Sequence, residues 1–271
     1  MDYRTYTPDD TLLPFVKCFW TLEIPEEEEL KRQTIVPDGC VEMIFHYGDA
    51  YKQYLSNGQS LLQPKCFVIG QLTQPLEIEP TGATGIFSVR FHPEGFMPFS
   101  TTPIKQLENN AVPLDQLFGA QGLELEKTVL KSPTTEDRIF QVAQFLSKQL
   151  QSSATIDRIV KQTVCVILSA DDRLSINTLT KEHQINRRSL ERKFAANIGL
   201  SPKLLHKTLR LQTSLKRLFD GNFTSLTALA YDGGYYDQAH FIRDFKEFTG
   251  FTPKEFYGKH LAMSSLFYGS E

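Results

Sequence analysis

Three residues in the first half of the chain have the chemistry of metal ligands. His92 and Glu94 flank Pro93, and His46 stands in an earlier apolar run. A β barrel can hold a metal with His and Glu, but there is no His-x-His pair and no third ligand at a suitable spacing. We therefore expect no metal and no cofactor, and ordinary polar or turn roles for these side chains.

Catalytic patterns are also weak. Asp38 and Glu42 could form a carboxylate pair, yet Asp38 precedes Gly39, which is typical of a turn. The sequence contains neither a Gly-x-Ser-x-Gly motif nor a glycine-rich phosphate loop. Its four cysteines form no Cys-x-x-Cys pair, which favours reduced and mostly buried thiols. We therefore expect that the chain is not an enzyme.

An internal repeat after residue 174 carries the strongest pattern. Leu190 and Phe194 recur 51 residues later as Phe241 and Phe245, whereas Leu179 recurs after 50 residues as Leu229. The second copy therefore has one extra residue, which we place in its turn. One copy has the length of a helix-turn-helix with a connecting helix.

Each copy combines a capping residue, an apolar anchor pair and a polar outer face. Asn186 and Asp237 are suited to begin the two second helices, and Gly199 and Gly250 to end them. The outer faces carry side chains that bind bases and phosphates in the major groove, where Arg pairs with guanine and Gln with adenine. The predicted DNA-binding residues are Asn186, Arg187, Arg188, Ser189, Arg192, Lys193, Asp237, Gln238, Ala239, His240, Arg243 and Lys246.

The elements that must position these residues differ between the two halves of the chain. Up to about residue 115, short apolar runs at 41–47, 66–69 and 85–91 are bounded by turn signals, which predicts antiparallel strands in a barrel or sandwich. From residue 132 the apolar spacing changes to three and four residues, which predicts helices. Residues 204–219 form one long predicted helix between the two copies. The predicted fold class is α+β in two domains, with an antiparallel β domain followed by an all-α domain of two helix-turn-helix units.

The charge follows the same division. Residues 1–170 carry 14 basic and 21 acidic side chains, whereas residues 171–271 carry 15 basic and 11 acidic ones. A basic half joined to an acidic half points to a nucleic-acid-binding domain attached to a domain of another kind. The net charge of −3 for the whole chain therefore does not argue against DNA as a partner.

The segment from about residue 155 to residue 260 resembles the DNA-binding domain of AraC/XylS-type transcription regulators. The likeness rests on INRRSLERKFAANIGLSPK (185–203) and ALAYDGGYYDQAHFIRDFKEFTGFTPKEF (228–256). It implies two helix-turn-helix units that read successive major grooves of double-stranded DNA. Asn186 stands where Ser is commoner, and Gly233 stands where Ala is usual, which we expect to loosen that turn slightly.

A weaker likeness covers the first half. The stretches LLPFVKCFWTLEI (12–24), VPDGCVEMIFHYG (36–48), FSVRFHPEGFMPF (87–99) and VPLDQLFG (112–119) are similar to the β-rich N-terminal domain of a subset of these regulators. The likeness implies a sensor or dimerisation role and no particular ligand. Aromatic and polar side chains in this half are candidates for a small-molecule effector pocket, with core packing as the alternative reading: Trp20, Phe45, His46 and Phe91.

These patterns divide the chain into four segments. They are a β-rich sensor domain (1–131), a helical connector (132–153), the double helix-turn-helix domain (154–261) and a tail (262–271). The connector has two open roles, dimerisation of two copies of the chain or packing on the β domain. RNA polymerase is a further candidate partner, which the second copy would contact. With no signal peptide and no apolar run of about 18 residues, we expect a cytoplasmic protein with no membrane partner.

Two other classes of function stay open. An enzyme with a DNA-binding tail would carry a stoichiometric metal, given His46, His92 and the cysteines of the β half. A ligand-independent architectural protein would have a filled β domain and no ligand-induced rise in melting temperature.

Overall fold

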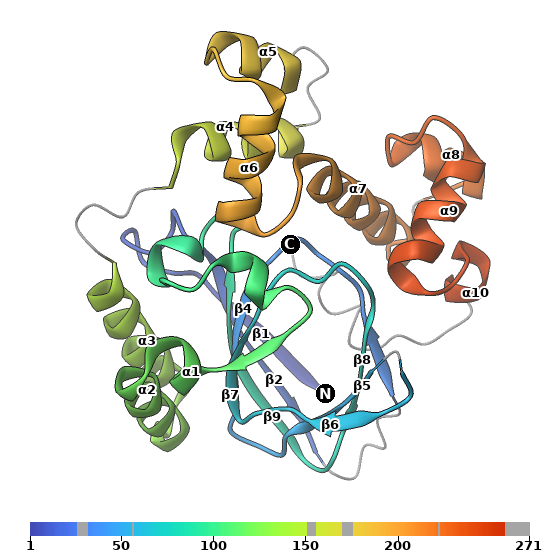
Figure 1. Ribbon diagram of the computed structural model, residues 1–271. Coiled ribbons are helices and arrows are strands. Elements are labelled where there is room, and N and C mark those ends of the chain that lie inside the picture. Colours follow the sequence, from blue (N-terminus) through green and yellow to red (C-terminus); the bar gives the residue numbers. More distant parts are fainter. Residues whose placement is uncertain (26–31, 56, 151–155, 170–175, 222, 258–271) are drawn as a thin grey trace.

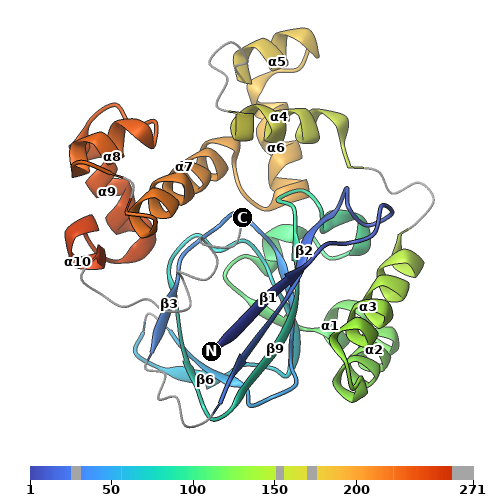
Figure 2. The same ribbon diagram turned by 180° about the vertical axis from the view of Figure 1, so that it is seen from behind.

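The computed structural model describes residues 1–25, 32–55, 57–150, 156–169, 176–221 and 223–257. These residues form a β-rich N-terminal domain and an all-helical C-terminal domain (Figures 1 and 2). This arrangement confirms the predicted α+β fold class. No helix among the described residues is both long enough and apolar enough to cross a lipid bilayer.

Two antiparallel sheets build the N-terminal domain. The large sheet has the strand order β1-β2-β9-β4-β7-β10 and the small sheet has the order β3-β8-β5-β6. Their strands are β1 (Asp2–Tyr6), β2 (Val16–Ile24), β3 (Gln33–Ile35), β4 (Glu42–His46), β5 (Tyr51–Tyr54), β6 (Ser60–Leu62), β7 (Cys66–Ile69), β8 (Leu76–Pro80), β9 (Thr84–Phe91) and β10 (Ala111–Pro113). Side chains from both sheets share one apolar cluster, so the sheets face each other as a sandwich. The three runs predicted as strands correspond to β4, β7 and β9.

Strand β4 contributes side chains to both faces of the large sheet. Met43 and Phe45 belong to the main hydrophobic core, whereas Ile44 and His46 face the space between the sheets. Successive side chains of a strand point to opposite faces. Both faces of this sheet are therefore covered, and all eight residues of β9 are buried.

Three helices cover the outer face of the large sheet. They are α1 (Leu114–Phe118), α2 (Ala120–Lys131) and α3 (Thr135–Gln149), and they pack on it through buried residues such as Leu125, Val129 and Val142. Helices α1 and α2 were not predicted, because residues 114–131 had been assigned to the β-rich segment. Helix α3 lies in the predicted connector and packs on the β domain, which is one of the two roles considered for that segment. The other role, dimerisation, stays a prediction.

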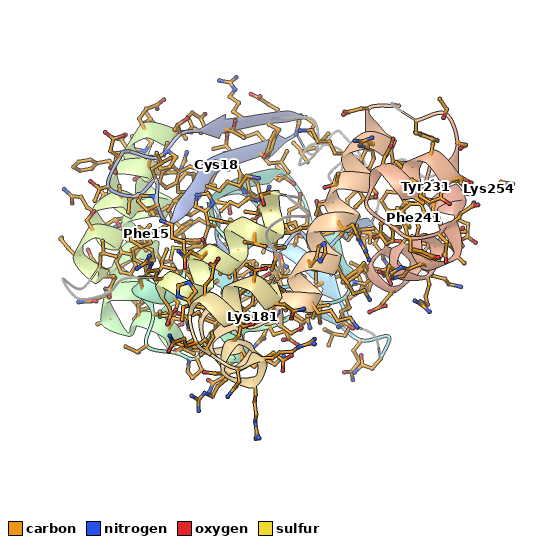
Figure 3. All side chains as sticks on the ribbon, turned by 90° about the horizontal axis from the view of Figure 1, so that it is seen from above. Phe15, Cys18, Lys181, Tyr231, Phe241 and Lys254 are labelled. Atoms are coloured by element: carbon orange, nitrogen blue, oxygen red, sulfur yellow. The ribbon has the colours of Figure 1, made fainter. Side chains whose placement is uncertain are left out.

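The C-terminal domain consists of seven described helices. They are α4 (Arg158–Ser169), α5 (Ile176–Glu182), α6 (Arg187–Ile198), α7 (Pro202–Phe219), α8 (Leu226–Asp232), α9 (Gln238–Thr249) and α10 (Pro253–Tyr257). The pairs α5–α6 and α8–α9 are the two helix-turn-helix units, which lie apart at the two ends of α7 (Figure 1). In Figure 3, Lys181 marks the first unit, and Tyr231 with Phe241 mark the second. The predicted helix over 204–219 is confirmed as α7.

Two short segments of the N-terminal domain pack closely on the C-terminal domain. The 3-10 helix η2 (Ile104–Leu107) packs against the end of α6, where a Cβ on Gly199 would lie 3.2 Å from Ile104 Cγ2. The loop 36–40 lies on α7, where the Gln212 side-chain amide donates to the Pro37 carbonyl at 2.5 Å. A Cβ on Gly39 of the same loop would lie 3.1 Å from Leu205 Cδ1. Each helix-turn-helix unit thus contacts the N-terminal domain, the first through η2 and the second through α7 and through Val36, which packs in the apolar cluster of Phe241 and Phe245.

Candidate nucleic-acid interface and sensor cavity

The turns of the two units share one hydrogen-bond pattern. The Ile185 amide donates to the Thr180 carbonyl at 3.0 Å, and the Tyr235 amide donates to the Ala230 carbonyl at 2.9 Å. The residue before each amide has a positive φ, which is 51° at Gln184 and 73° at Gly234. Glycine adopts this conformation without the Cβ penalty that Gln184 incurs. The turns run over 183–186 and 233–237, which confirms the extra residue predicted in the second copy.

The second helix of each unit begins and ends in the predicted way. The Asn186 side chain accepts from the Ser189 amide at 2.8 Å, and the Asp237 carboxylate accepts from the His240 amide at 2.7 Å. Gly199 and Gly250 end the helices in the left-handed conformation. The anchors Leu190, Phe194, Phe241 and Phe245 are at most 1% exposed. The inner faces of α6 and α9 are therefore fixed in the domain core, and their outer faces are oriented by it.

The outer faces present fewer free side chains than the sequence predicted. In α6 the exposed predicted residues are Arg187, Arg188 and Arg192, and in α9 they are Ala239, Arg243 and Lys246. Arg188 with Arg192 and Ala239 with Arg243 occupy equivalent positions, one turn apart on each helix. These two pairs are exposed on the outer faces of α6 and α9, and their contact with base edges stays a prediction.

Several other predicted DNA-binding residues make contacts within the protein. Asn186 and Asp237 cap the helices, and Ser189 is partly buried. Gln238 accepts from the Thr227 hydroxyl at 3.1 Å, and His240 lies 3.4 Å from the Asp244 carboxylate. These contacts favour a role in shaping the outer faces, and direct contact with DNA by these residues stays a prediction.

In each unit an ion pair joins the second helix to the helix that precedes the unit or to the residue just before that helix. The positions of the acidic and the basic residue are exchanged between the two units. Lys193 Nζ of α6 lies 2.5 Å from Asp157 Oδ2, just before α4. Asp244 Oδ1 of α9 lies 3.2 Å from Lys207 Nζ of α7. Asp157 and Lys207 are equivalent positions of the repeat, 50 residues apart, and Lys193 and Asp244 are equivalent at 51. Although burial raises it, the pKa of Asp157 is lowered overall by Lys193 and by two backbone amides.

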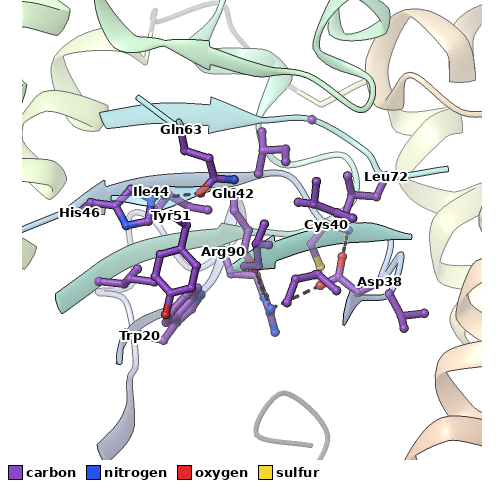
Figure 4. A pocket seen from close by; sticks show the side chains of 17 residues that line it. Trp20, Asp38, Cys40, Glu42, Ile44, His46, Tyr51, Gln63, Leu72 and Arg90 are labelled. Carbon is purple, nitrogen blue, oxygen red and sulfur yellow. Dashed lines mark hydrogen bonds and ion pairs between the residues drawn. The ribbon is translucent and has the colours of Figure 1, made fainter. Parts of the chain in front are cut away.

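A cavity of about 80 Å³ lies between the two sheets of the sensor domain (Figure 4). Of the four predicted effector-pocket residues, Trp20 and His46 line it. Phe45 and Phe91 do not, because they point to the opposite face of the large sheet and belong to the core under α1–α3. Because neighbouring side chains of a strand point to opposite faces, Phe45 and His46 could not both line one cavity.

A buried ion pair lines this cavity between its two ends. Arg90 Nε donates to Glu42 Oε1 at 2.7 Å, and Arg90 Nη2 lies 3.4 Å from Asp38 Oδ2. Burial raises the pKa of Glu42, and the Arg90 guanidinium opposes that rise. Asp38 and Glu42, considered above as a catalytic pair, are therefore the two partners of Arg90. Among the described residues, no group of three His, Cys, Asp or Glu side chains is arranged to hold a metal ion.

Two protein-family models match the chain, one for each domain. Residues 4–113 match a family described as a domain of unknown function, DUF6597. Residues 179–259 match a helix-turn-helix domain family, which covers both units and the linker helix between them. The C-terminal region is an AraC-type helix-turn-helix domain. The match over residues 179–259 supports a DNA-binding regulator of transcription.

Comparison with solved structures finds chains of related fold with TM-scores below 0.5. ToxT from Vibrio cholerae aligns over 95% of this chain and 98% of its own, with 14% identity and a TM-score of 0.48. A probable AraC family regulator from Rhodopseudomonas palustris aligns over 40% of this chain and 98% of its own, with 28% identity and a TM-score of 0.33. No curated protein sequence matches the chain.

A charged cluster in the AraC-type domain was missed by the sequence reasoning. Asp244 is 1% exposed and pairs with both Lys207 and Arg210 of α7, the latter at 3.1 Å. Arg210 also donates to the Gly234 carbonyl at 3.2 Å and stacks on the Tyr235 ring, 3.9 Å from its centroid. The position of Asp244 between two anchor phenylalanines could have revealed the cluster, because a buried carboxylate requires a cation. This cluster fixes α9 and its turn on the linker helix.

Gly233 of the AraC-type domain was expected to loosen its turn, and the structure gives it a packing role. Its φ of −80° is open to any residue. A Cβ at this position, however, would overlap the Oγ of Ser214 on α7, which is fully buried. The glycine therefore allows α7 to approach the turn closely.

Proposed function

We propose that this protein is a sequence-specific transcription regulator whose helices α6 and α9 enter major grooves of double-stranded DNA. The observation that carries the proposal is the pair of equivalent outer faces, Arg188 with Arg192 and Ala239 with Arg243, each fixed from behind by a cap, a turn and an apolar anchor pair. Arginine pairs with guanine through two hydrogen bonds, and alanine contacts the thymine methyl group. The first unit exposes three arginines and contributes more to affinity than the second.

The experiment begins with selection of binding sites from random DNA duplexes by the full chain. Arg188→Ala and Arg192→Ala should each weaken binding to the selected site by about 1–3 kcal/mol, which is roughly 5- to 150-fold in Kd. They should also relax the sequence preference at the half-site that α6 reads. Lys127→Ala, which removes an exposed cation from α2 on the sensor domain, is the matched control and should bind like the wild type.

Selection that enriches no sequence would refute the proposal. Wild-type affinity in both arginine variants would show that α6 is not the reader. Because phosphate contacts release counterions, the affinity of the wild type should fall steeply with salt concentration.

The second part of the proposal is control of DNA binding by a small-molecule effector in the sensor domain. The loop 36–40 supports it, because this loop reaches both the cavity and the linker helix. Asp38 lines the cavity and pairs with Arg90, while Pro37 accepts the hydrogen bond from Gln212 of α7. A ligand that displaces the loop would therefore shift α7 and the second unit with it. Homodimer formation, a polymerase contact and a cytoplasmic location stay predictions from the sequence.

A further inference from the structure

The sensor cavity is mostly apolar, with polar groups at its two ends. Ile44, Leu76, Ile78 and Ile86 are among the residues of its wall. In Figure 4, His46, Tyr51 and Gln63 lie toward one end, and Asp38 and Cys40 lie toward the other. Glu42 and Arg90 form the buried ion pair described above. The end at His46 is the one whose hydrogen bonds are incomplete among the described residues.

A chain of hydrogen bonds fixes the tautomer of His46. The Gln63 side-chain amide nitrogen donates to Gln53 Oε1 at 3.4 Å, so the amide oxygen of Gln63 faces the imidazole. His46 Nε2 lies 3.2 Å from that oxygen and must therefore carry the proton and donate. The other ring nitrogen, Nδ1, is consequently a hydrogen-bond acceptor.

His46 Nδ1 lacks a donor within the described part of the chain. The side chain is 2% exposed and the Nδ1 atom is buried, yet it has no hydrogen-bond partner among the described residues. Burial lowers the pKa of His46 to about 4, so the ring is neutral at pH 7. Buried acceptors in native proteins are normally satisfied by protein, water or ligand, and this one belongs to a cavity-lining residue.

The surroundings set the charge and size of a ligand that could supply the donor. An anion would find no free cation among the described residues that line the cavity, because Arg90 is already shared by Glu42 and Asp38 and His46 is neutral. A cation at the His46 end would have no carboxylate beside it. A cavity of about 150 Å³ accommodates benzene, so about 80 Å³ accommodates roughly three or four heavy atoms by proportion.

We propose that the sensor cavity binds a short-chain neutral alcohol, whose hydroxyl donates to His46 Nδ1 and whose alkyl part contacts Ile44, Ile78 and Ile86. This inference rests on the proposed function, because the alcohol would be the effector of the regulator. It concerns the ligand class alone and does not depend on which DNA sequence the protein reads.

The test compares propan-2-ol with acetone on the full chain labelled with ¹⁵N-histidine. Both probes have four heavy atoms, but only propan-2-ol can donate a hydrogen bond. Propan-2-ol should shift the imidazole resonances of His46 saturably, and acetone should bind at least tenfold more weakly. Cyclohexanol, which exceeds the cavity, should give no saturable shift. Equal binding of propan-2-ol and acetone, or no saturable response to propan-2-ol, would overturn the inference.

Two variants test whether the response to propan-2-ol arises in the cavity. Leu76→Phe keeps His46 but fills the cavity, and it should abolish the response to propan-2-ol. His183→Gln alters a histidine in the turn of the first unit, and it should leave the response unchanged. A response that survives in Leu76→Phe would place the alcohol elsewhere and overturn the inference.

DNA binding measured on the same preparations keeps the two proposals distinguishable. Intact DNA binding without an alcohol response overturns the ligand class and leaves the reader proposal standing. A specific alcohol response without any change in DNA affinity supports the site and refutes effector control by this ligand.

Discussion

Replacement of Gly233 by alanine tests whether close approach of α7 dictates the turn of the second unit. The backbone at Gly233 has a φ of −80° and is not strained by a side chain. The new Cβ would overlap Ser214 Oγ and would lie 3.2 Å from the Leu229 carbonyl oxygen and 3.3 Å from Tyr235 Cδ2. Overpacking of this kind destabilises a protein by about 1–3 kcal/mol. Alanine recovers about 0.4–1 kcal/mol by restricting the unfolded chain, so we expect a net loss of about 1–2 kcal/mol.

Ser214→Ala should reverse this effect. It removes the overlapping oxygen, whose own hydrogen bond goes to the Arg210 carbonyl within the same helix and contributes little. In this background Gly233→Ala should change the free energy of unfolding by less than about 1 kcal/mol, because only the contacts of 3.2 and 3.3 Å to Leu229 and Tyr235 remain. The double-mutant cycle should therefore show a coupling of about 1–2 kcal/mol between the two positions.

Equilibrium urea unfolding of the full chain, followed through the C-terminal transition, measures the four free energies of the cycle. A neutral or stabilising Gly233→Ala in the wild-type background would refute the packing argument. Equal effects of the substitution in both backgrounds would show that Ser214 is not the cause.

Two further predictions concern buried charge. His46, with its pKa lowered to about 4, is neutral in the folded state and protonates near pH 6.5 when unfolded, so unfolding takes up a proton between these values. The free energy of unfolding should fall by about 2–3 kcal/mol between pH 7 and pH 4.5, and His46→Leu should lack this component; an equal fall in both proteins would contradict the assignment. Asp244→Asn leaves Lys207 and Arg210 facing a neutral amide, and it should cost about 2–3 kcal/mol of stability and weaken DNA binding by the second unit. Asp220→Asn, an exposed carboxylate at the end of α7, is its control, and similar losses in the two variants would exclude a special role for Asp244.

The features that sequence reasoning predicted well are local. Caps, glycine stops and apolar anchors depend on residues within one or two turns of each other, so Asn186, Asp237, Gly199 and Gly250 were assigned from spacing alone. The extra residue in the second turn was visible for the same reason. The outer faces of α6 and α9 follow directly from the position of the anchors.

The features that were missed depend on distant parts of the chain. Asp157 pairs with Lys193 across 36 residues and Asp244 with Arg210 across 34, so no local pattern identifies the partner. Helices α1 and α2 were missed because residues 114–131 were placed in the β-rich segment; Gly122 lies close to the Leu114 carbonyl of α1, a contact that no local pattern predicts. Two of the four residues predicted for the cavity, Trp20 and His46, face it. Phe45 does not, because side chains alternate along β4 and its ring points to the other face.

If the loop 36–40 couples an effector to DNA binding, as we propose, sensing and DNA recognition are thermodynamically reciprocal. It lines the cavity through Asp38 and Cys40 and rests on α7 through Pro37 and Gly39. If a ligand changes DNA affinity through this loop by some factor, DNA must change the ligand's affinity by the same factor. Ligand binding to the free protein and to the DNA complex would then differ, and the ratio of the two dissociation constants would measure how much free energy five residues transmit between the domains.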